Sequence, residues 1–377
     1  MILNHCRLIA PLSGGTSTED GAVVIENGVI QAVCASPAAS GFDCGGKTLL
    51  PGLIDLHTHI TGLTDLDWKD DAALAHQAGL YLAHGFTTIR DCGSLDRAAN
   101  HLRDRIAAGK CAGPRIIACG RILTPTEVPE NDPLMPMYSI ADGKYEFLKA
   151  ARREFAEGGD FLKIMASGSA FHPGGIPNQP LLLDEELEMA VRAAQMKGSS
   201  VAAHAHADAA IARCARLGVH TIEHATYISA ETIELIKNTP NCYLVPTLAA
   251  MYVSVPDESG FWSRRLGEML RQCADNIRRA YLAGLKPGFG TDSSADMPQY
   301  EQGIEFRYRS ELCGMKNIDI LLQATKYSAE ILGLSDEIGE IRSGLQADLI
   351  LVDGNPDQNI SVMYHLPDQV WKDGTRI

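Results

Sequence analysis

The sequence has no excess of positive charge and no long apolar run. No stretch of its 377 residues approaches the roughly 20 continuous apolar residues of a membrane-spanning helix. Its formal net charge is -14, which argues against nucleic acid and anionic membranes as partners. The N-terminus also lacks the basic region, apolar core and cleavage site of a signal peptide. We therefore expect a cytoplasmic protein that binds neither nucleic acid nor membranes.

Spaced cysteine pairs and phosphate-binding glycine motifs are missing as well. The ten cysteines contain no Cys-x-x-Cys pair and no zinc-finger spacing, so they are predicted to be reduced and mostly buried thiols. No Gly-x-Gly-x-x-Gly motif follows the first strand expected in the central region. Its absence argues against an open, doubly wound dinucleotide-binding sheet.

What the sequence does contain is a regular alternation of short apolar segments and helical stretches. This alternation begins near Leu50 and predicts an α/β fold, a closed (β/α)8 TIM-type barrel over residues 51–335. The opening strands include an Asn27-Gly28 hairpin signal, and β-type sequence returns after Gly333. These two ends predict a small β-sandwich module built from residues 1–50 and 336–377.

One of the expected helices carries clear start and stop signals. Asp184 is its expected N-cap, and Glu185 and Glu186 follow in the first turn. Residues 187, 190, 191 and 194 are apolar at helical spacing, and Gly198 is expected to end the helix. A further long segment, from Ala249 to Leu285, is predicted to hold extra helices over the barrel mouth.

Histidines and an aspartate stand at the ends of several predicted strands. His57 and His59 are two residues apart on the first barrel strand, so their side chains share a face and can chelate one cation. For this pair alone, two packed structural histidines are the alternative. The other candidates are His204 and His206 at the end of the fifth strand, His224 at the sixth and Asp292 at the eighth. Together they lie where barrel active sites form, and suit zinc and similar cations.

A lysine interrupts the apolar fourth strand, Phe-Leu-Lys-Ile-Met. A buried Lys163 is costly if it is charged and unpaired. One interpretation is that its ammonium group extends to the solvent-exposed rim of the barrel or pairs with a carboxylate. Alternatively, burial lowers its pKa, and the neutral amine adds CO2 to form a carbamate whose two oxygens can bridge two cations.

These motifs resemble those of the amidohydrolase superfamily. The likeness is strongest to its imidazolonepropionase-like branch, which contains prolidase-type (Xaa-Pro) dipeptidases and arginine or lysine carboxypeptidases. It covers essentially the whole chain, and as a set the motifs are specific for the superfamily but much less so for substrate. The motifs are PGLIDLHTH, FLKIMASG, AHAHADAAIARCARLGVHTIEHAT, GTDSS and ADLILVDGNP.

The resemblance implies a role for each candidate ligand. It implies two divalent cations, with zinc expected, the more buried one held by His57, His59 and Asp292. A carbamylated Lys163 would bridge the two cations. His204 and His224 would hold the second. A hydroxide shared by both cations would attack the substrate carbonyl, and Asp292 would pass its proton to the leaving nitrogen.

Three further residues are candidates for substrate contact. Tyr227 resembles a substrate-contacting position in relatives, with a packed loop tyrosine as the alternative. His206 is expected either to support the metal ligands from a position next to them or to be a packed structural imidazole. Relatives commonly carry a histidine after the third strand, but residues 123–127 contain none here, and His172 is the candidate to replace it.

The predicted function is hydrolysis of an amide bond in a small carboxylate-bearing substrate, such as an Xaa-Pro dipeptide or an N-acyl amino acid. Hydrolysis of a cyclic amide or a urea-type bond is the alternative. Deamination is less favoured because the glutamate that those relatives carry shortly after the fifth-strand histidine is absent here, and Lys163 is present. A non-catalytic scaffold is disfavoured because every expected ligand is present. The predicted partners are a small-molecule substrate and further copies of the chain in a homo-oligomer.

Overall fold

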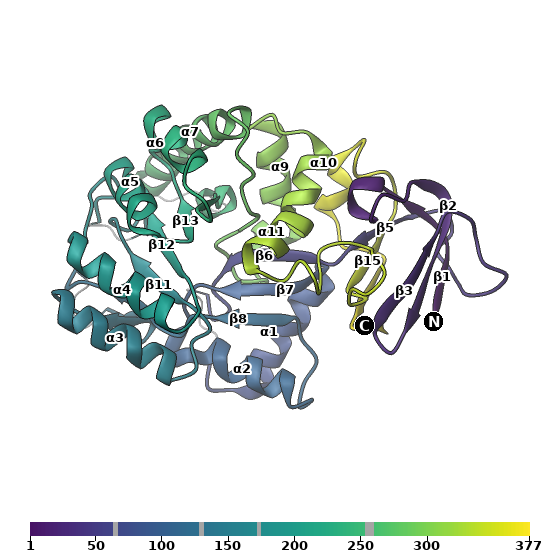
Figure 1. The fold of residues 1–377 in the computed structure, drawn as a ribbon, viewed down its shortest axis with the longest axis horizontal. Helices are drawn as coiled ribbons and strands as arrows, with labels where there is room; N and C mark the ends of the chain where they lie inside the picture. Colours follow the sequence, from purple (N-terminus) through teal and green to yellow (C-terminus); the bar gives the residue numbers. More distant parts are fainter. Residues whose placement is uncertain (63–66, 128–131, 172–174, 253–259) are drawn as a thin grey trace.

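Two parallel sheets and one mixed sheet organise the chain. Figure 1 shows a computed structural model that describes residues 1–62, 67–127, 132–171, 175–252 and 260–377. One parallel sheet has the order β6-β7-β8, and the other has the order β10-β9-β11-β12-β13-β14. The α/β fold with parallel strands predicted from the alternation is therefore confirmed. The strands of these two sheets are β6 (Leu53–Thr58), β7 (Phe86–Asp91), β8 (Arg115–Ala118), β9 (Ile122–Thr124), β10 (Tyr138–Ile140), β11 (Leu162–Met165), β12 (Val201–Ala205), β13 (Thr221–His224) and β14 (Tyr243–Val245).

The two ends of the chain share the mixed sheet. Its order is β17-β16-β15-β5-β1-β2-β3, with β4 paired to β1. The antiparallel pairing of β15 with β5 joins the C-terminal segment to the N-terminal strands, and Figure 1 shows this sheet at the right, beside both termini. Asn27 and Gly28 have positive φ between β2 and β3, as the hairpin signal predicts. The strands are β1 (Ile2–Leu8), β2 (Thr18–Glu26), β3 (Val29–Cys34), β4 (Phe42–Asp43), β5 (Thr48–Pro51), β15 (Leu349–Val352), β16 (Gln369–Lys372) and β17 (Thr375–Arg376).

Helices alternate with the parallel strands and pack on their outer side (Figure 1). They are α1 (Asp71–Ala83), α2 (Ala98–Ala107), α3 (Lys144–Ala156), α4 (Asp184–Met196), α5 (Asp208–Leu217), α6 (Ala230–Lys237), α7 (Phe261–Leu282), α8 (Pro298–Glu301), α9 (Ile304–Glu311), α10 (Asn317–Leu322) and α11 (Ser328–Leu332). Short 3-10 turns are η1 (Ala10–Leu12), η2 (Leu95–Arg97), η3 (Met135–Met137), η4 (Leu248–Met251) and η6 (Ile360–Tyr364), and η5 (Gln323–Tyr327) is a π-helical turn. Across the described ranges, no helix has both the length and the apolar content to cross a membrane.

Helix α4 corrects one detail of the sequence prediction. Its N-cap is Leu183 and Asp184 is the first helical residue, because the Glu186 carboxylate accepts a hydrogen bond from Leu183 N at 2.8 Å. The apolar stripe is confirmed, since residues 187, 190, 191 and 194 are all buried. The ten cysteines are free thiols, and all but Cys34 and Cys111 are buried.

A segment without regular strand hydrogen bonding lies between the two parallel sheets. Residue Gly288 donates its N–H to Leu244 O of β14, and Phe289 O accepts from Leu56 N of β6. Further along, Asp292 N donates to His57 O at 2.7 Å. These bonds hold residues 288–292 against β14 on one side and β6 on the other.

Candidate metal centre

The parallel strands bring the predicted ligands to one place. In the six-stranded sheet, Met165 is in register with His204, and Ala205 with His224. His57 lies within β6, and His59 follows directly after it. Since the carboxyl ends of parallel strands meet at one edge, side chains far apart in sequence converge there.

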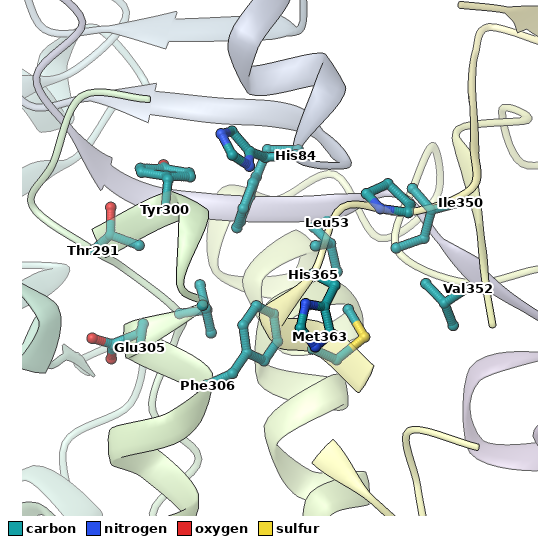
Figure 2. Close-up of a pocket in the computed structure, with 14 residues that line it drawn as sticks. Leu53, His84, Thr291, Tyr300, Glu305, Phe306, Ile350, Val352, Met363 and His365 are labelled. Atoms are coloured by element: carbon teal, nitrogen blue, oxygen red, sulfur yellow. The ribbon is translucent and has the colours of Figure 1, made fainter. Parts of the chain in front are cut away.

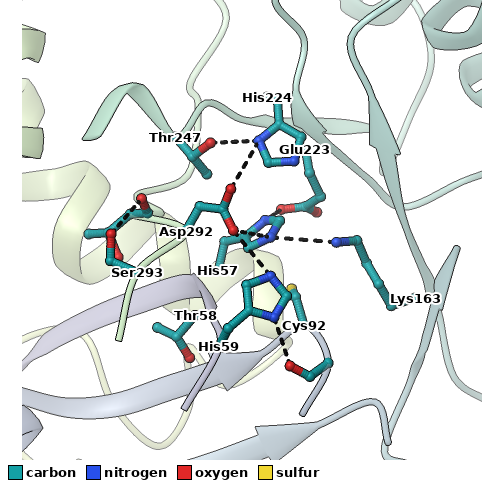
Figure 3. Close-up of polar contacts among 12 residues, drawn as sticks. His57, Thr58, His59, Cys92, Lys163, Glu223, His224, Thr247, Asp292 and Ser293 are labelled. Carbon is teal, nitrogen blue, oxygen red and sulfur yellow. Dashed lines mark hydrogen bonds and ion pairs between the residues drawn. The ribbon is translucent and has the colours of Figure 1, made fainter. Parts of the chain in front are cut away.

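The first group of candidate ligands consists of His57, His59 and Asp292. Asp292 Oδ1 lies 3.3 Å from His57 Nε2 and 3.1 Å from His59 Nε2 (Figure 3). One ligand atom from each residue lies within 4.8 Å of the others. These two imidazole nitrogens and one carboxylate oxygen therefore face a common point.

Hydrogen bonds behind the first group fix both rings. His57 Nδ1 is 2.7 Å from Glu223 Oε2, and Glu223 is also paired with Arg90 at 2.9 Å. His59 Nδ1 donates to Gly93 O at 2.7 Å. With Nδ1 engaged in this way, Nε2 of each ring is left to bind a cation.

The second group consists of His204, His206 and His224. Their ligand atoms also lie within 4.8 Å of one another, and their ring centroids are 4.5 to 4.8 Å apart. His204 Nε2 donates to Gly168 O at 3.2 Å, which leaves its Nδ1 for a cation. His224 Nδ1 is hydrogen bonded to Thr247 at 2.6 Å and His206 Nδ1 to Thr226 at 2.8 Å, so Nε2 of each ring is left. The structure thus places His206 beside His204 and His224.

Lys163 is buried beside the first group and lines the same cavity as both groups, with 2% of its surface exposed. Its Nζ lies 3.5 Å from His57 Nε2, as Figure 3 shows. No carboxylate within the described residues forms an ion pair with it. The salt-bridge partner expected for an ordinary charged lysine is therefore not found in the part of the chain that the structure describes.

Different physical causes determine the pKa values in the two groups. Burial raises the pKa of Asp292, but the charges and hydrogen bonds of His57 and His59 outweigh it and hold that pKa well below its usual range. Burial likewise opposes ionisation of Glu223, yet Arg90 and His57 lower its pKa to about 2. In the second group, burial dominates, and lowers the pKa of His206 to about 3 and those of His204 and His224 well below 6.5. Neutral imidazoles are the form that binds metal.

Two candidate ligands, and the residue after one of them, have strained backbone. His224, Ala225 and Asp292 have φ of 69°, 51° and 59°. Residues other than glycine rarely take this left-handed conformation, which costs about 1 to 3 kcal/mol each. Two residues before Asp292, a side chain at Gly290 would bring its Cβ to 3.0 Å from His57 Cβ, so glycine permits the close approach of the two segments. Backbone strain at candidate ligands such as His224 and Asp292 is typical of a functional site.

A cavity of about 270 Å³ opens over both groups. Its polar wall contains the six predicted ligands and His206. Apolar side chains form much of the rest, namely Ile122, Leu134, Met137, Met165, Phe171, Met251, Met297 and Pro298. This arrangement places a metal-type ligand set at the wall of a space large enough for a small molecule.

The three candidate substrate contacts have different outcomes. His206 lines the cavity, whereas Tyr227 is half-buried against the hydrophobic core and is not among the cavity's described lining residues. His172 lies outside the described residues. Sequence reasoning missed Glu223, whose signal was a carboxylate within a buried strand, and Tyr138, which enters the cavity from β10 with no motif to mark it.

A second pocket lies where β6 and β15 meet α9 (Figure 2). His84, Tyr300, Glu305 and His365 are among its lining residues. It encloses only about 20 Å³, which is room for one or two water molecules. The cavity lined by the two ligand groups is therefore the candidate substrate site.

Comparisons with known proteins agree with this geometry. Residues 48–377 match the profile described as "Amidohydrolase family". The crystal structure of a Xaa-Pro dipeptidase with bound methionine superposes with a TM-score of 0.88 at 30% identity, covering 100% of this chain and 99% of that one. A prolidase complexed with N-methylphosphonate-L-proline gives 0.88 at 28% identity, covering 100% and 98%. Among curated proteins, ochratoxinase of Aspergillus niger is 27% identical over 86% of this chain and 75% of its own length.

Proposed function

Because the chain belongs to the amidohydrolase family, and is therefore a hydrolase, we propose that it cleaves an amide C–N bond at a centre of two divalent cations. The proposed substrate is small and carries a carboxylate, as Xaa-Pro dipeptides and N-acyl amino acids do. The similarity to a Xaa-Pro dipeptidase and to a prolidase supports this substrate class.

The proposal includes a closed (β/α)8 barrel. Strand β8 pairs with β7 and β9 pairs with β11, so the short connection between β8 and β9 links the two parallel sheets on one side. The bonds of residues 288–292 to β14 and β6 link them on the other side. Residues 51–335 would form this barrel, and residues 1–50 and 336–377 the flanking β-sandwich module.

The donor set fits two cations. His57, His59 and Asp292 would hold the first, and His204 and His224 the second. Imidazole nitrogens with carboxylate oxygens are the ligands that zinc and similar cations prefer. Lys163, buried and without a carboxylate partner within the described residues, would complete both sites as a carbamate. A carbamate carries two oxygens and one negative charge, which suits a position between two cations.

When bound, the cations would supply Lewis acidity that polarises the substrate carbonyl and lowers the pKa of the attacking water. The residues of the chain carry the remaining steps. Asp292 would accept the proton that the water loses and deliver it to the leaving nitrogen. Its strongly lowered pKa means that it is ionised, and so able to accept that proton, at neutral pH. Glu223 and Thr247 would hold the His57 and His224 rings in their tautomers.

The observation that carries the proposal is the convergence of two ligand groups and one buried lysine on the wall of one cavity. Metal analysis of protein expressed with zinc and bicarbonate tests it, with a substrate panel of dipeptides, N-acyl amino acids and cyclic ureas. We expect about two cations per chain and hydrolysis of the first two substrate classes. Turnover of cyclic amides or ureas alone would support the alternative reading. One cation with release of ammonia would indicate a deaminase, and full activity without metal would contradict the mechanism.

A further inference from the structure

Tyr138 is a cavity residue whose hydroxyl forms no hydrogen bond with any described residue. It is the first residue of β10, at the edge of the six-stranded sheet, and it lines the same cavity as Lys163 and Asp292. Within the described part of the chain its hydroxyl has no hydrogen-bond partner. The other tyrosine of this cavity, Tyr252, donates to Gln302 Oε1 at 3.1 Å. Tyr138 therefore offers a phenol donor that none of the described residues uses.

The surroundings of Tyr138 favour a strong hydrogen bond to a bound molecule. Ile122, Met137 and Met165 line the cavity with it, and an apolar wall excludes water that would compete for the donor. Burial, and to a lesser degree the charges of Asp132, Glu127 and Asp292, raise the pKa of Tyr138 to about 12. The phenol thus keeps its proton at any physiological pH and acts only as a neutral donor.

We propose that the Tyr138 hydroxyl donates a hydrogen bond to the oxygen of the scissile carbonyl, where negative charge develops during hydrolysis. This inference rests on the proposed function and names one of its catalytic residues. Asp292 must lie near the attacking water and the leaving nitrogen to move a proton between them. Tyr138 and Asp292 line the same cavity.

The step balances without any further reactant. The water oxygen forms a bond to the carbonyl carbon, one of its protons goes to Asp292, and the π pair moves to the carbonyl oxygen that Tyr138 contacts. When the C–N bond breaks, that pair returns to form the carboxyl group and the nitrogen takes the proton from Asp292. Tyr138 gives up no proton and strengthens its hydrogen bond only while the oxygen is charged.

The test compares Tyr138→Phe with Tyr243→Phe. Tyr243 is the first residue of β14, at the opposite edge of the same sheet, and does not line the cavity. Losing one donor to a developing oxyanion should lower kcat by about 10²-fold with little change in KM. Tyr243→Phe should keep the kcat of the wild-type protein. Both variants should keep the wild-type metal content and Tm, because neither hydroxyl touches a ligand.

A second measurement does not depend on turnover. A methylphosphonate analogue, in which tetrahedral phosphorus replaces the carbonyl carbon, should bind Tyr138→Phe more weakly by about the factor lost in kcat/KM. An unchanged kcat, or a rise in KM alone with unchanged analogue binding, would overturn the inference while leaving the proposed function intact. Absence of amide hydrolysis in metal-loaded wild-type protein would overturn both together.

Discussion

The two histidine groups of the centre are held in place by different means. In the first group, His57 and His59 both contact the Asp292 carboxylate, and Glu223 with its partner Arg90 lies behind His57. In the second group, three imidazoles face one another, and neutral hydroxyl or carbonyl groups lie behind them. The first group is organised by opposite charges in the protein itself. The second brings like groups together, and a cation would be what stabilises it.

This difference implies that the two groups bind their cations differently. The first group resembles a preformed site, in which the carboxylate oxygen lies close to where a cation would bind. In the second group, neutral nitrogen lone pairs face one another, which favours binding of a cation over a proton at neutral pH. Because the second group consists of three neutral imidazoles and has no carboxylate of its own, we expect its cation to exchange more readily than the first.

The largest effect should come from breaking the link between the groups. Lys163→Ala removes the proposed bridging carbamate, so we expect loss of nearly all activity together with loss of metal, the second cation first. Short carboxylic acids added with zinc should restore part of the activity, because they place two oxygens in the vacated space. Activity assays and metal analysis check this outcome. A high-resolution map with a bare ammonium at Lys163 beside two well-bound cations would refute the carbamate.

The next effect concerns the acid–base role of the first group. Asp292→Asn keeps the shape of the side chain but cannot accept a proton, so kcat should fall by about 10²- to 10⁴-fold under saturating zinc. KM should change far less, since the loss is in the chemical step. Steady-state kinetics with metal content measured in parallel gives the answer. Near-normal turnover with two cations bound would require a different base.

A smaller effect should follow from loosening the support behind His57. Glu223→Gln removes the charge that orients the ring, and we expect zinc affinity at the first site to fall about 10- to 100-fold. Glu154→Gln is the matched control, because Glu154 is also fully buried and paired with an arginine, Arg97, but contacts no candidate ligand. Both changes should lower Tm, whereas only Glu223→Gln should alter zinc titrations. Equal zinc affinity in the two variants would argue against a positioning role for Glu223.

The smallest effect is a pH dependence of the second group. The pKa of His206 is about 3 in the folded protein and near 6.5 when unfolded, so below pH 6.5 the unfolded chain binds more protons. Stability of metal-free protein should then fall as the pH drops from 6.5 toward 3, by at most about 1.4 kcal/mol per pH unit from this residue. Denaturant titrations at several pH values should show a shallower fall in His206→Gln. An identical slope in the two proteins would rule out this contribution.

The residues at strand ends were the most predictable part of the molecule. Strand and helix alternation reveals which segments lie side by side, and parallel strands place their ends together, so His57, His204 and Asp292 could be grouped from the sequence. The mixed sheet followed from β-type sequence at both ends of the chain, and its β15–β5 pairing is observed. These features depend on periodicity, which is local and visible in one sequence.

The residues that surround the candidate ligands were not predictable in the same way. Tyr138 follows a long connection, and the hydrophobic pattern does not determine the path of that connection. The search for a histidine after the third strand covered residues 123–127 and did not reach Tyr138. Tyr227 was chosen because it resembles a substrate-contacting position in relatives; its side chain packs against the core, and its contact with substrate stays a prediction. Such positions depend on loop backbone angles and side-chain rotamers, which the hydrophobic pattern does not specify. The N-cap of α4 was misplaced by one residue for a related reason, because the Glu186 hydrogen bond decides it.

The contact between Thr291 and Asp55 has a consequence for how the protein is made. These residues are 236 positions apart, and their hydrogen bonds align the backbone on which His57 and Asp292 sit. At ribosomal speeds of about 5 to 20 residues per second, His57 waits roughly 10 to 50 s for Asp292 to be synthesised. The three histidines of the second group emerge within 21 residues of one another, well before Asp292. On the ribosome, the second group is therefore complete first, and the first group is completed only after residues 288–292 have been synthesised.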